Sequence, residues 1–235
     1  MLDLQNNLLL AKKYMVESIY RSANIEGIAV TFPETQTICD GMSVAGHSVD
    51  DINAVTDLKH AWEWIFNNIG QDVDIDALKH LNRISGKYTV INAGSIRDIY
   101  DAPIRVPISA DKDYYPPVPP SKVEINSEIK RITSSGTLDA ALEFFCYICK
   151  SQFFNDGNKR TATLITNMFM IKNGLGILSI PLIHRLTFYE RLTAFYENDS
   201  NIEIFKEFLK EYCLTGYSRN TQSIENSYGE IEDGR

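Results

Sequence analysis

The chain has 235 residues, of which 44% are hydrophobic and 23% charged, with a formal net charge of −8. This composition fits a globular protein with its own core and argues against nucleic acid as a partner, since phosphate backbones are bound mainly by clustered lysine and arginine. No apolar run approaches the roughly 20 residues of a membrane span, and the first residues lack a secretory signal. We therefore expect a cytoplasmic protein without membrane contact.

The first half of the chain reads as helices followed by a long loop. Apolar residues at helical spacing predict helices over 3–22, 50–69 and Ile75–Ile84, with Gly27 and Pro33 after the first of them. The stretch from Lys87 to Pro120 is rich in proline and carries β-type residues at Ile104–Ile108. It predicts a stiff loop that holds a short hairpin at most.

The second half returns to helical periodicity. The predicted helices cover Lys122–Ser134, Leu138–Ser151, Thr161–Lys172, Ile183–Tyr196 and Ile202–Leu214. Cys146 and Cys149 lie within one apolar helical run and are interpreted as core residues rather than as a redox or zinc pair. The expected fold class is all-α. We divide the chain into an N-terminal helical segment (1–48), a core domain (49–215) and a flexible polar tail (216–235).

The segment Phe153–Arg160 interrupts two apolar helices and carries chemistry suited to an anion. A helix N-terminus offers free backbone N–H groups, Gly157 permits close approach, and Lys159 and Arg160 add cationic donors. Asp156 is placed to hold a magnesium ion that bridges phosphate oxygens. A second interpretation stays open, in which Asp156-Gly157 is an ordinary turn, Asn158 a helix cap and Lys159-Arg160 a solvated basic pair.

From Phe154 through Arg160 this segment resembles the signature of the Fic/Doc family, H-x-F-x-D/E-G-N-G/K-R, in every position but the first. The resemblance implies a Fic-type helical bundle with a β-hairpin flap. Members typically transfer AMP from ATP to a hydroxyl side chain (Ser, Thr or Tyr) of a target protein, and Doc-like members phosphorylate instead. It implies ATP and Mg²⁺ as cofactors, with Asp156 on the metal, Gly157 and Asn158 lining the anion hole, and Lys159 and Arg160 on the phosphates.

Two further stretches resemble family elements. Gly94-Ser95-Ile96-Arg97 and the residues around Val106-Pro107-Ile108 resemble the flap that docks a target's backbone by strand addition; the docking strand is assigned to Ile104, Arg105, Val106, Pro107 and Ile108. The segment Ser22-Ala23-Asn24-Ile25-Glu26-Gly27 resembles the inhibitory motif S/T-x-x-x-E-G/N, made here by Ser22, Glu26 and Gly27.

The inhibitory interpretation has a physical basis and an alternative. A carboxylate in an anion site repels a triphosphate and occupies its donors; the alternative is a surface glutamate followed by a helix-stopping glycine. The glutamate's usual partner is a second arginine, at the position of Thr163 here. Glu26 therefore needs Lys159 or Arg160 as its partner.

Gln152 occupies the place of the family's catalytic histidine, and an amide cannot act as a general base. None of the four histidines (His47, His60, His80 and His184) obviously replaces it. The resemblance favours a Fic protein of bacterial type, and three hypotheses stay open: a transferase that works slowly or with another base, a nucleotide-binding pseudoenzyme that regulates a partner, and a peptide-docking module. A homodimer is left open as well.

Overall fold

The computed structural model describes residues 1–88, 90–101 and 103–217. Within these ranges the helices are α1 (Leu4–Ile25), α2 (Phe32–Cys39), α3 (Val49–Asn67), α4 (Ile75–Ser85), α5 (Lys122–Thr133), α6 (Leu138–Ser151), α7 (Asn158–Lys172), α8 (Arg185–Glu197) and α9 (Ile202–Tyr212), with 3-10 turns η1 (Leu182–His184) and η2 (Asp199–Asn201). Two antiparallel pairs complete the fold: β1 (Val106–Ser109) with β2 (Lys112–Tyr114), and β3 (Ile177–Leu178) with β4 (Leu214–Thr215). The predicted all-α bundle with a short hairpin is confirmed.

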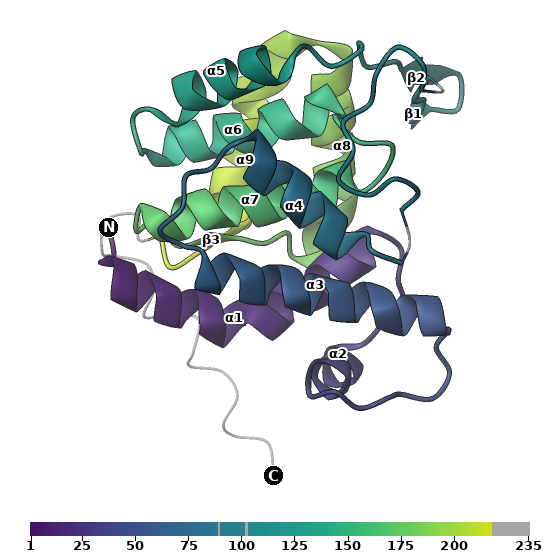
Figure 1. Ribbon diagram of the computed structural model, residues 1–235, viewed down its shortest axis with the longest axis vertical. Helices are drawn as coiled ribbons and strands as arrows, with labels where there is room; N and C mark the ends of the chain where they lie inside the picture. Colours follow the sequence, from purple (N-terminus) through teal and green to yellow (C-terminus); the bar gives the residue numbers. More distant parts are fainter. Residues whose placement is uncertain (89, 102, 218–235) are drawn as a thin grey trace.

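Helix α7 runs through the middle of the bundle (Figure 1). It packs against α1, α3, α4 and α6, and buried residues occupy nearly every position from Arg160 to Ile171. A helix surrounded by other helices is expected to be apolar all round. Because most of its sides are covered, a ligand can reach α7 mainly at its ends.

The structure corrects two of the sequence predictions. Helix α2 was not predicted, because Pro33 was interpreted as a boundary; it lies in the first turn, where proline is favoured, behind a capping box made by Thr31 and Glu34. Helix α7 begins at Asn158 rather than Thr161, because Gly157 adopts a left-handed φ of +74° and starts the helix there.

The division of the chain into segments 1–48, 49–215 and 216–235 stays a prediction. Residues 218–235 of the predicted tail lie outside the described residues. No helix in the described ranges is both long and apolar enough to cross a lipid bilayer.

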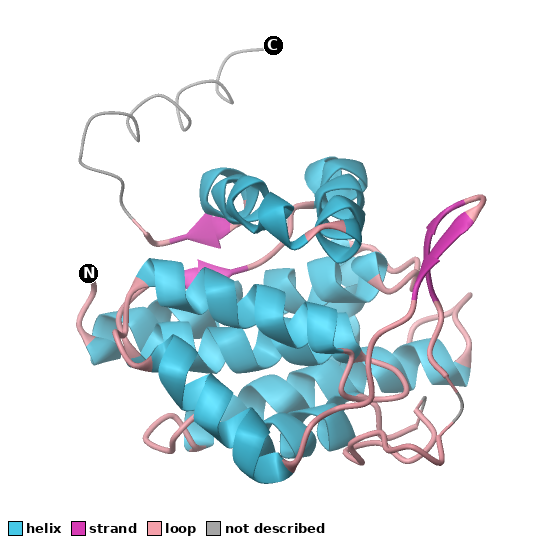
Figure 2. Cartoon of the chain, turned by 90° about the horizontal axis from the view of Figure 1, so that it is seen from above, coloured by secondary structure: helices cyan, strands magenta, loops and turns pink. Residues whose placement is uncertain are grey.

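The hairpin β1–β2 projects from one side of the helical bundle (Figure 2), and its strand β1 contacts α8. Tyr114, the last residue of β2, donates a hydrogen bond to the carbonyl of Lys150 at 3.0 Å. Its ring stacks on Tyr196 of α8, with centroids 5.1 Å apart. These contacts fix the base of the hairpin beside the C-terminal end of α6.

All four cysteines are buried. Burial raises the pKa of the Cys39 thiol to about 11 and that of Cys213 to about 12, and it also raises the pKa of Cys146 and of Cys149. The interpretation of Cys146 and Cys149 as core residues agrees with this burial.

Candidate functional site

A cavity of about 420 Å³ lies where the hairpin meets the start of α7. Its volume is in the usual range for small-ligand sites. Three segments line it, namely the strand entry Ile104, Arg105, Val106 and Pro107, the loop residues Gln152, Asn155, Asp156, Asn158 and Lys159, and the α8 residues Tyr189, Leu192, Thr193 and Tyr196. The cavity therefore joins the predicted docking strand to the predicted anion loop, although Ile108, Gly157 and Arg160 do not line it.

The start of α7 differs from the starts of the preceding helices. Helices α1 to α6 each begin with a side chain that accepts a hydrogen bond from a backbone N–H of the first turn, whereas α7 has no side-chain cap and no acidic residue in its first turn. Uncapped N–H groups and the helix dipole favour an anion at this position.

Asn158 shapes the loop instead of pointing freely into the cavity. Its Oδ1 accepts from the Phe154 N–H at 2.9 Å, and its Nδ2 donates to the Phe154 carbonyl at 2.7 Å and to Gln152 Oε1 at 3.0 Å. Phe154 itself is 1% exposed and anchors the loop in the core. The amide of Asn158 thus holds the loop in the curve that presents the α7 N-terminus.

Gln152 sits at the C-cap of α6 with a left-handed φ of +46°. Its Nε2 donates to the Cys149 carbonyl at 2.7 Å and to the Tyr196 hydroxyl at 3.2 Å, while its Oε1 accepts from Asn158. A primary amide has two N–H donors, so both are in use here. The Gln152 side chain can therefore form one more hydrogen bond with a ligand in the cavity, as an acceptor through the second lone pair of Oε1.

Asp156 is exposed and keeps one carboxylate oxygen free. Its Oδ1 accepts from the Gly157 N–H at 2.6 Å, which leaves Oδ2 for a ligand. The described residues contain no group of three or more His, Cys, Asp or Glu that could hold a metal ion by themselves. Mg²⁺ in nucleotide sites is commonly held by one or two carboxylates together with phosphates and water, and Asp156 fits that pattern.

Replacing Gly157 by alanine is expected to cost about 2 kcal/mol of unfolding free energy. An added Cβ would lie 3.0 Å from Arg160 Nη2 and 3.3 Å from Asn82 Nδ2, at a φ of +74°. Gly46→Ala is the matched control, because Gly46 has a φ of +86° and nothing within 4 Å of an added Cβ; it should cost about 1 kcal/mol. Equal urea midpoints for the two variants would show that the contacts of the added Cβ with Arg160 and Asn82 do not lower the stability of the protein.

Lys159 faces the cavity and is held by two groups from outside the loop. Its Nζ lies 3.6 Å from Oε1 of Glu26, at the C-cap of α1, and 5.9 Å from the ring centroid of Tyr189. Burial by itself would lower the pKa of Lys159, but Glu26 and Tyr189 raise it on balance. Lys159 is therefore a protonated cation at neutral pH, and a negative charge already stands next to it.

The segment Ser22–Gly27 is placed by these contacts at the back of the anion loop. The Glu26 N–H donates to the Ser22 carbonyl at 3.1 Å, Gly27 ends the helical turn, and the Tyr189 hydroxyl donates to the Ile25 carbonyl. Of the two partners predicted for Glu26, the structure brings it to Lys159. Thr163, at the position of the family's second arginine, donates to the Lys159 carbonyl at 3.0 Å.

Arg160 is turned away from the cavity. It is 5% exposed, and its Nη1 donates to the Ser85 carbonyl at the end of α4, at 3.0 Å. Its Nε is buried without a hydrogen-bond partner. Arg160 therefore connects α7 to α4 through its hydrogen bond to Ser85 and does not line the cavity. Of the two cations in the motif, Lys159 is the one that lines it.

Two buried side chains hold the motif loop in place: Arg97, from the stretch that resembles the flap, and Asn82, which sequence reasoning did not assign to the site. Arg97 is 5% exposed; its Nε donates to the Gln152 carbonyl at 2.7 Å, and its Nη2 donates to the Pro117 carbonyl at 3.0 Å. Asn82 donates to the Asp156 carbonyl at 3.1 Å and accepts from the Gly94 N–H at 2.7 Å. The flap-like segment 94–97 and the motif loop are therefore joined through side chains.

None of the four histidines, all of which lie in the described part of the chain, lines this cavity. His80 packs against Trp64 with ring centroids 4.7 Å apart, and His184 packs against Tyr212 at 4.5 Å. The Tyr196 hydroxyl accepts a hydrogen bond from Gln152, and burial raises the pKa of Tyr196 well above its ordinary value. No imidazole therefore lines the described part of this cavity, although histidine is the side chain that most often serves as a general base.

Comparison with known proteins adds independent findings. Residues 72–170 match the Fic/DOC family. The chain is 27% identical over 213 residues to "Protein adenylyltransferase Fic" of Drosophila sechellia, covering 85% of this chain and 41% of that protein, and 24% identical over 216 residues to the protein of the same name from Culex quinquefasciatus, covering 85% and 40%. The chain thus spans about two fifths of the length of these relatives.

Solved structures share the fold. A Fic domain-containing signaling protein from Bacteroides thetaiotaomicron superposes with a TM-score of 0.69 at 17% identity, covering 88% of this chain and 86% of that one. Fic-1 from C. elegans superposes with a TM-score of 0.67 at 21% identity, covering 88% of this chain and 64% of that one.

Proposed function

We infer that this chain, which belongs to the Fic/DOC family, binds ATP with Mg²⁺ at the start of α7 and transfers AMP slowly to a hydroxyl side chain of a target protein. One observation carries the proposal: the uncapped α7 N-terminus, the Lys159 ammonium and the edge of the hairpin share one cavity of about 420 Å³. An anion site and a strand edge side by side suit a reaction that joins a nucleotide to a polypeptide.

The residues at the start of α7 have separate roles in the proposed mechanism. The N–H groups of the first turn of α7 and the Lys159 ammonium bind the phosphates, and Asn158 keeps the loop in shape. Asp156 would hold Mg²⁺, which when bound neutralises charge on the phosphate oxygens. The target hydroxyl oxygen attacks the α-phosphorus, and the bond to the departing pyrophosphate breaks.

The slowness of the proposed transfer follows from Gln152. The hydroxyl proton must leave as the new P–O bond forms; an amide cannot take it, so the proton passes to solvent water, which is a weak base. The one free lone pair of Gln152 Oε1 can accept a hydrogen bond from the hydroxyl, which orients it without removing its proton. The same engagement of the amide favours a second candidate function, a nucleotide-binding protein that regulates a partner without transfer.

Isothermal calorimetry of Mg²⁺ and ATP tests nucleotide binding. Asp156→Ala and Lys159→Ala should each weaken binding by at least about tenfold, since hydrogen bonds to charged groups contribute about 1.5–3 kcal/mol. Lys172→Ala is the matched control, because Lys172 lies at the other end of α7 and pairs with the exposed Asp72. Absence of ATP binding by the unchanged protein would reject the proposal; labelled ATP mixed with a candidate target then separates transfer from binding alone.

We further propose that Glu26 restrains nucleotide binding. Glu26→Gly should raise ATP affinity about tenfold, or about 1.4 kcal/mol, since the carboxylate 3.6 Å from Lys159 Nζ competes with the phosphates for the same cation. Glu17→Gln serves as the control, because Glu17 lies on the same helix and pairs with Arg21 instead. An unchanged Kd for Glu26→Gly by calorimetry would dispose of the restraint.

A further inference from the structure

A second cavity, of about 490 Å³, adjoins the first. The two share a wall: Tyr114 lines the second cavity, and Tyr196, stacked on it at 5.1 Å, lines the first. The chain itself passes from one cavity to the other between consecutive residues, since Ser151 lines the second and Gln152 lines the first. Anything that occupies the second cavity therefore lies directly beside the transfer site.

The interior of the second cavity is apolar and aromatic. Phe195 and Ile132 are 3% and 5% exposed, and Tyr147 and Ile202 contribute half-buried faces from α6 and α9. Tyr147 is itself held edge-on against Phe153, with ring centroids 5.6 Å apart. The walls thus come from four helices and the hairpin, which makes the cavity a preformed part of the fold.

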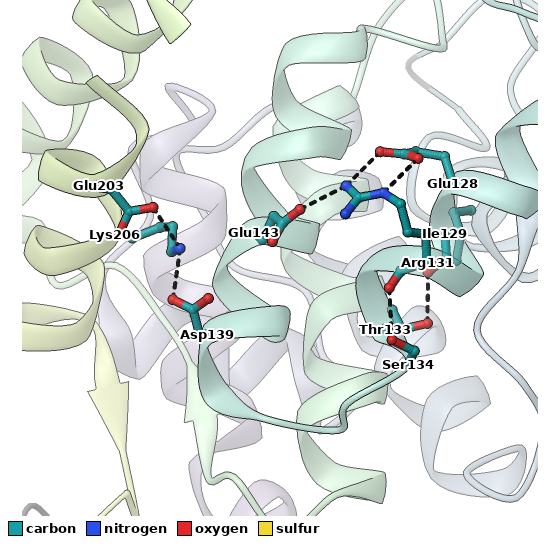
Figure 3. A network of polar contacts seen from close by, with 9 residues as sticks. All are labelled: Glu128, Ile129, Arg131, Thr133, Ser134, Asp139, Glu143, Glu203 and Lys206. Carbon is teal, nitrogen blue, oxygen red and sulfur yellow. Dashed lines mark hydrogen bonds and ion pairs between the residues drawn. The ribbon is translucent and has the colours of Figure 1, made fainter. Parts of the chain in front are cut away.

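The charged side chains of this cavity are already paired with one another. Arg131 bridges α5 and α6 by donating to Glu128 at 2.8 and 2.9 Å and to Glu143 at 2.9 Å (Figure 3). Lys150 pairs with Asp199, and its Nζ lies 4.6 Å from the ring centroid of Phe195. A charged ligand would have to break these pairs, whereas an apolar group would not.

We propose that this second cavity, here called the anchor cavity (Tyr114, Ile132, Tyr147, Phe195 and Ile202), takes one aromatic or large aliphatic side chain of the target protein. The inference rests on the proposed function, because it assigns part of the target's docking surface. A free metabolite would need convergent unpaired polar groups to orient it. An apolar centre inside a polar rim is instead the anatomy of a hot-spot pocket in a protein interface.

Position supports the target as the occupant. A target segment that follows the edge of β1 brings its hydroxyl to the first cavity, and the anchor cavity is the hollow directly across the Tyr114–Tyr196 wall. A side chain a few residues from the modified hydroxyl can enter it without leaving the hairpin, since an extended strand advances about 3.3 Å per residue. The anchor would then select targets that carry a large apolar residue near the modified position.

Methyl NMR of isoleucine-labelled protein tests the cavity without any nucleotide. N-acetyl-tryptophanamide should shift the Ile132 and Ile202 methyl signals and leave Ile204, which is 52% exposed on α9, unmoved; N-acetyl-aspartamide should shift none. Ile202→Trp fills the cavity and should remove the effect at Ile132, whereas Ile204→Trp should retain it. No response at Ile132, or equal behaviour of the two tryptophan variants, would overturn the proposal.

A second measurement connects the cavity to the target. In a Gln152→His background, Ile202→Trp should lower transfer of labelled AMP to target protein about tenfold at unchanged ATP affinity, and Ile204→Trp should lower neither. Loss of self-association in sedimentation with Ile202→Trp alone would identify a second copy as the occupant and overturn the proposal. Failure of every variant to bind ATP would reject the proposed function, while the NMR result would still decide what the cavity accepts.

Discussion

Replacing Gln152 by histidine is expected to raise the rate of AMP transfer by about 10²- to 10⁴-fold, the usual contribution of general base catalysis. Gln152 lines the cavity at the junction of the hairpin and the anion loop. Its Nε2 donates hydrogen bonds to the Cys149 carbonyl and to the Tyr196 hydroxyl. An imidazole can donate one ring N–H to the same carbonyl and keep its second nitrogen free, with a pKa of about 6.5, to take a proton.

The comparison that isolates the base is Gln152→Met, which has a similar length and no basic atom. Transfer of radiolabelled AMP should rise in the histidine variant alone, and its rate should increase with pH between about 6 and 7 as the imidazole loses its proton. If the histidine and methionine variants transfer AMP at the same rate, or if the rate of the histidine variant does not change with pH, the cavity is not arranged for this reaction. Such a result would favour the second candidate function, a nucleotide-binding protein that does not transfer AMP.

Arg97→Met is expected to lower the free energy of unfolding by about 3 kcal/mol, because it leaves two carbonyl groups without the charged donor that serves them. Those carbonyls belong to Gln152 and Pro117, so the same change should loosen both the motif loop and the segment after the hairpin. Hydrogen exchange should therefore increase in both places together, and helix α9 should remain unaffected.

The matched control is Arg105→Met, eight residues further along. The Arg105 side chain is 66% exposed and pairs only loosely with Asp113, at 3.5 Å, and exposed pairs of this kind contribute about 0–1 kcal/mol. Urea denaturation of the two variants gives the comparison. Similar midpoints would mean that Arg97 does not hold the two segments together.

The sequence predicted the parts of this protein that depend on local order. Long helices such as α3 and α6 follow from apolar periodicity, and the loop at Asp156–Lys159 follows from residue types that a helix start and an anion require together. The resemblance to the Fic/Doc motif also limits the partners of Glu26 to Lys159 and Arg160, because the uncharged Thr163 lies where the family has its second arginine.

What escaped the sequence depends on contacts between distant residues. The direction of Arg160 is set by the carbonyl of Ser85, 75 positions away, and no local pattern carries that information. The same holds for Tyr189 and Tyr196, which read as ordinary positions of a helix until the fold places them on the cavity wall. Helix α2 was missed for a different reason, since proline ends one helix and begins another with equal ease.

The burial of the four thiols has a practical consequence for following the hairpin. Thiolate is the reactive form of cysteine, so maleimide dyes will react slowly with the native protein while it stays folded. A cysteine introduced at the exposed Ser109, at the end of β1, would then take up a dye selectively. The approach of a target to this strand could be watched by fluorescence without removing any native cysteine.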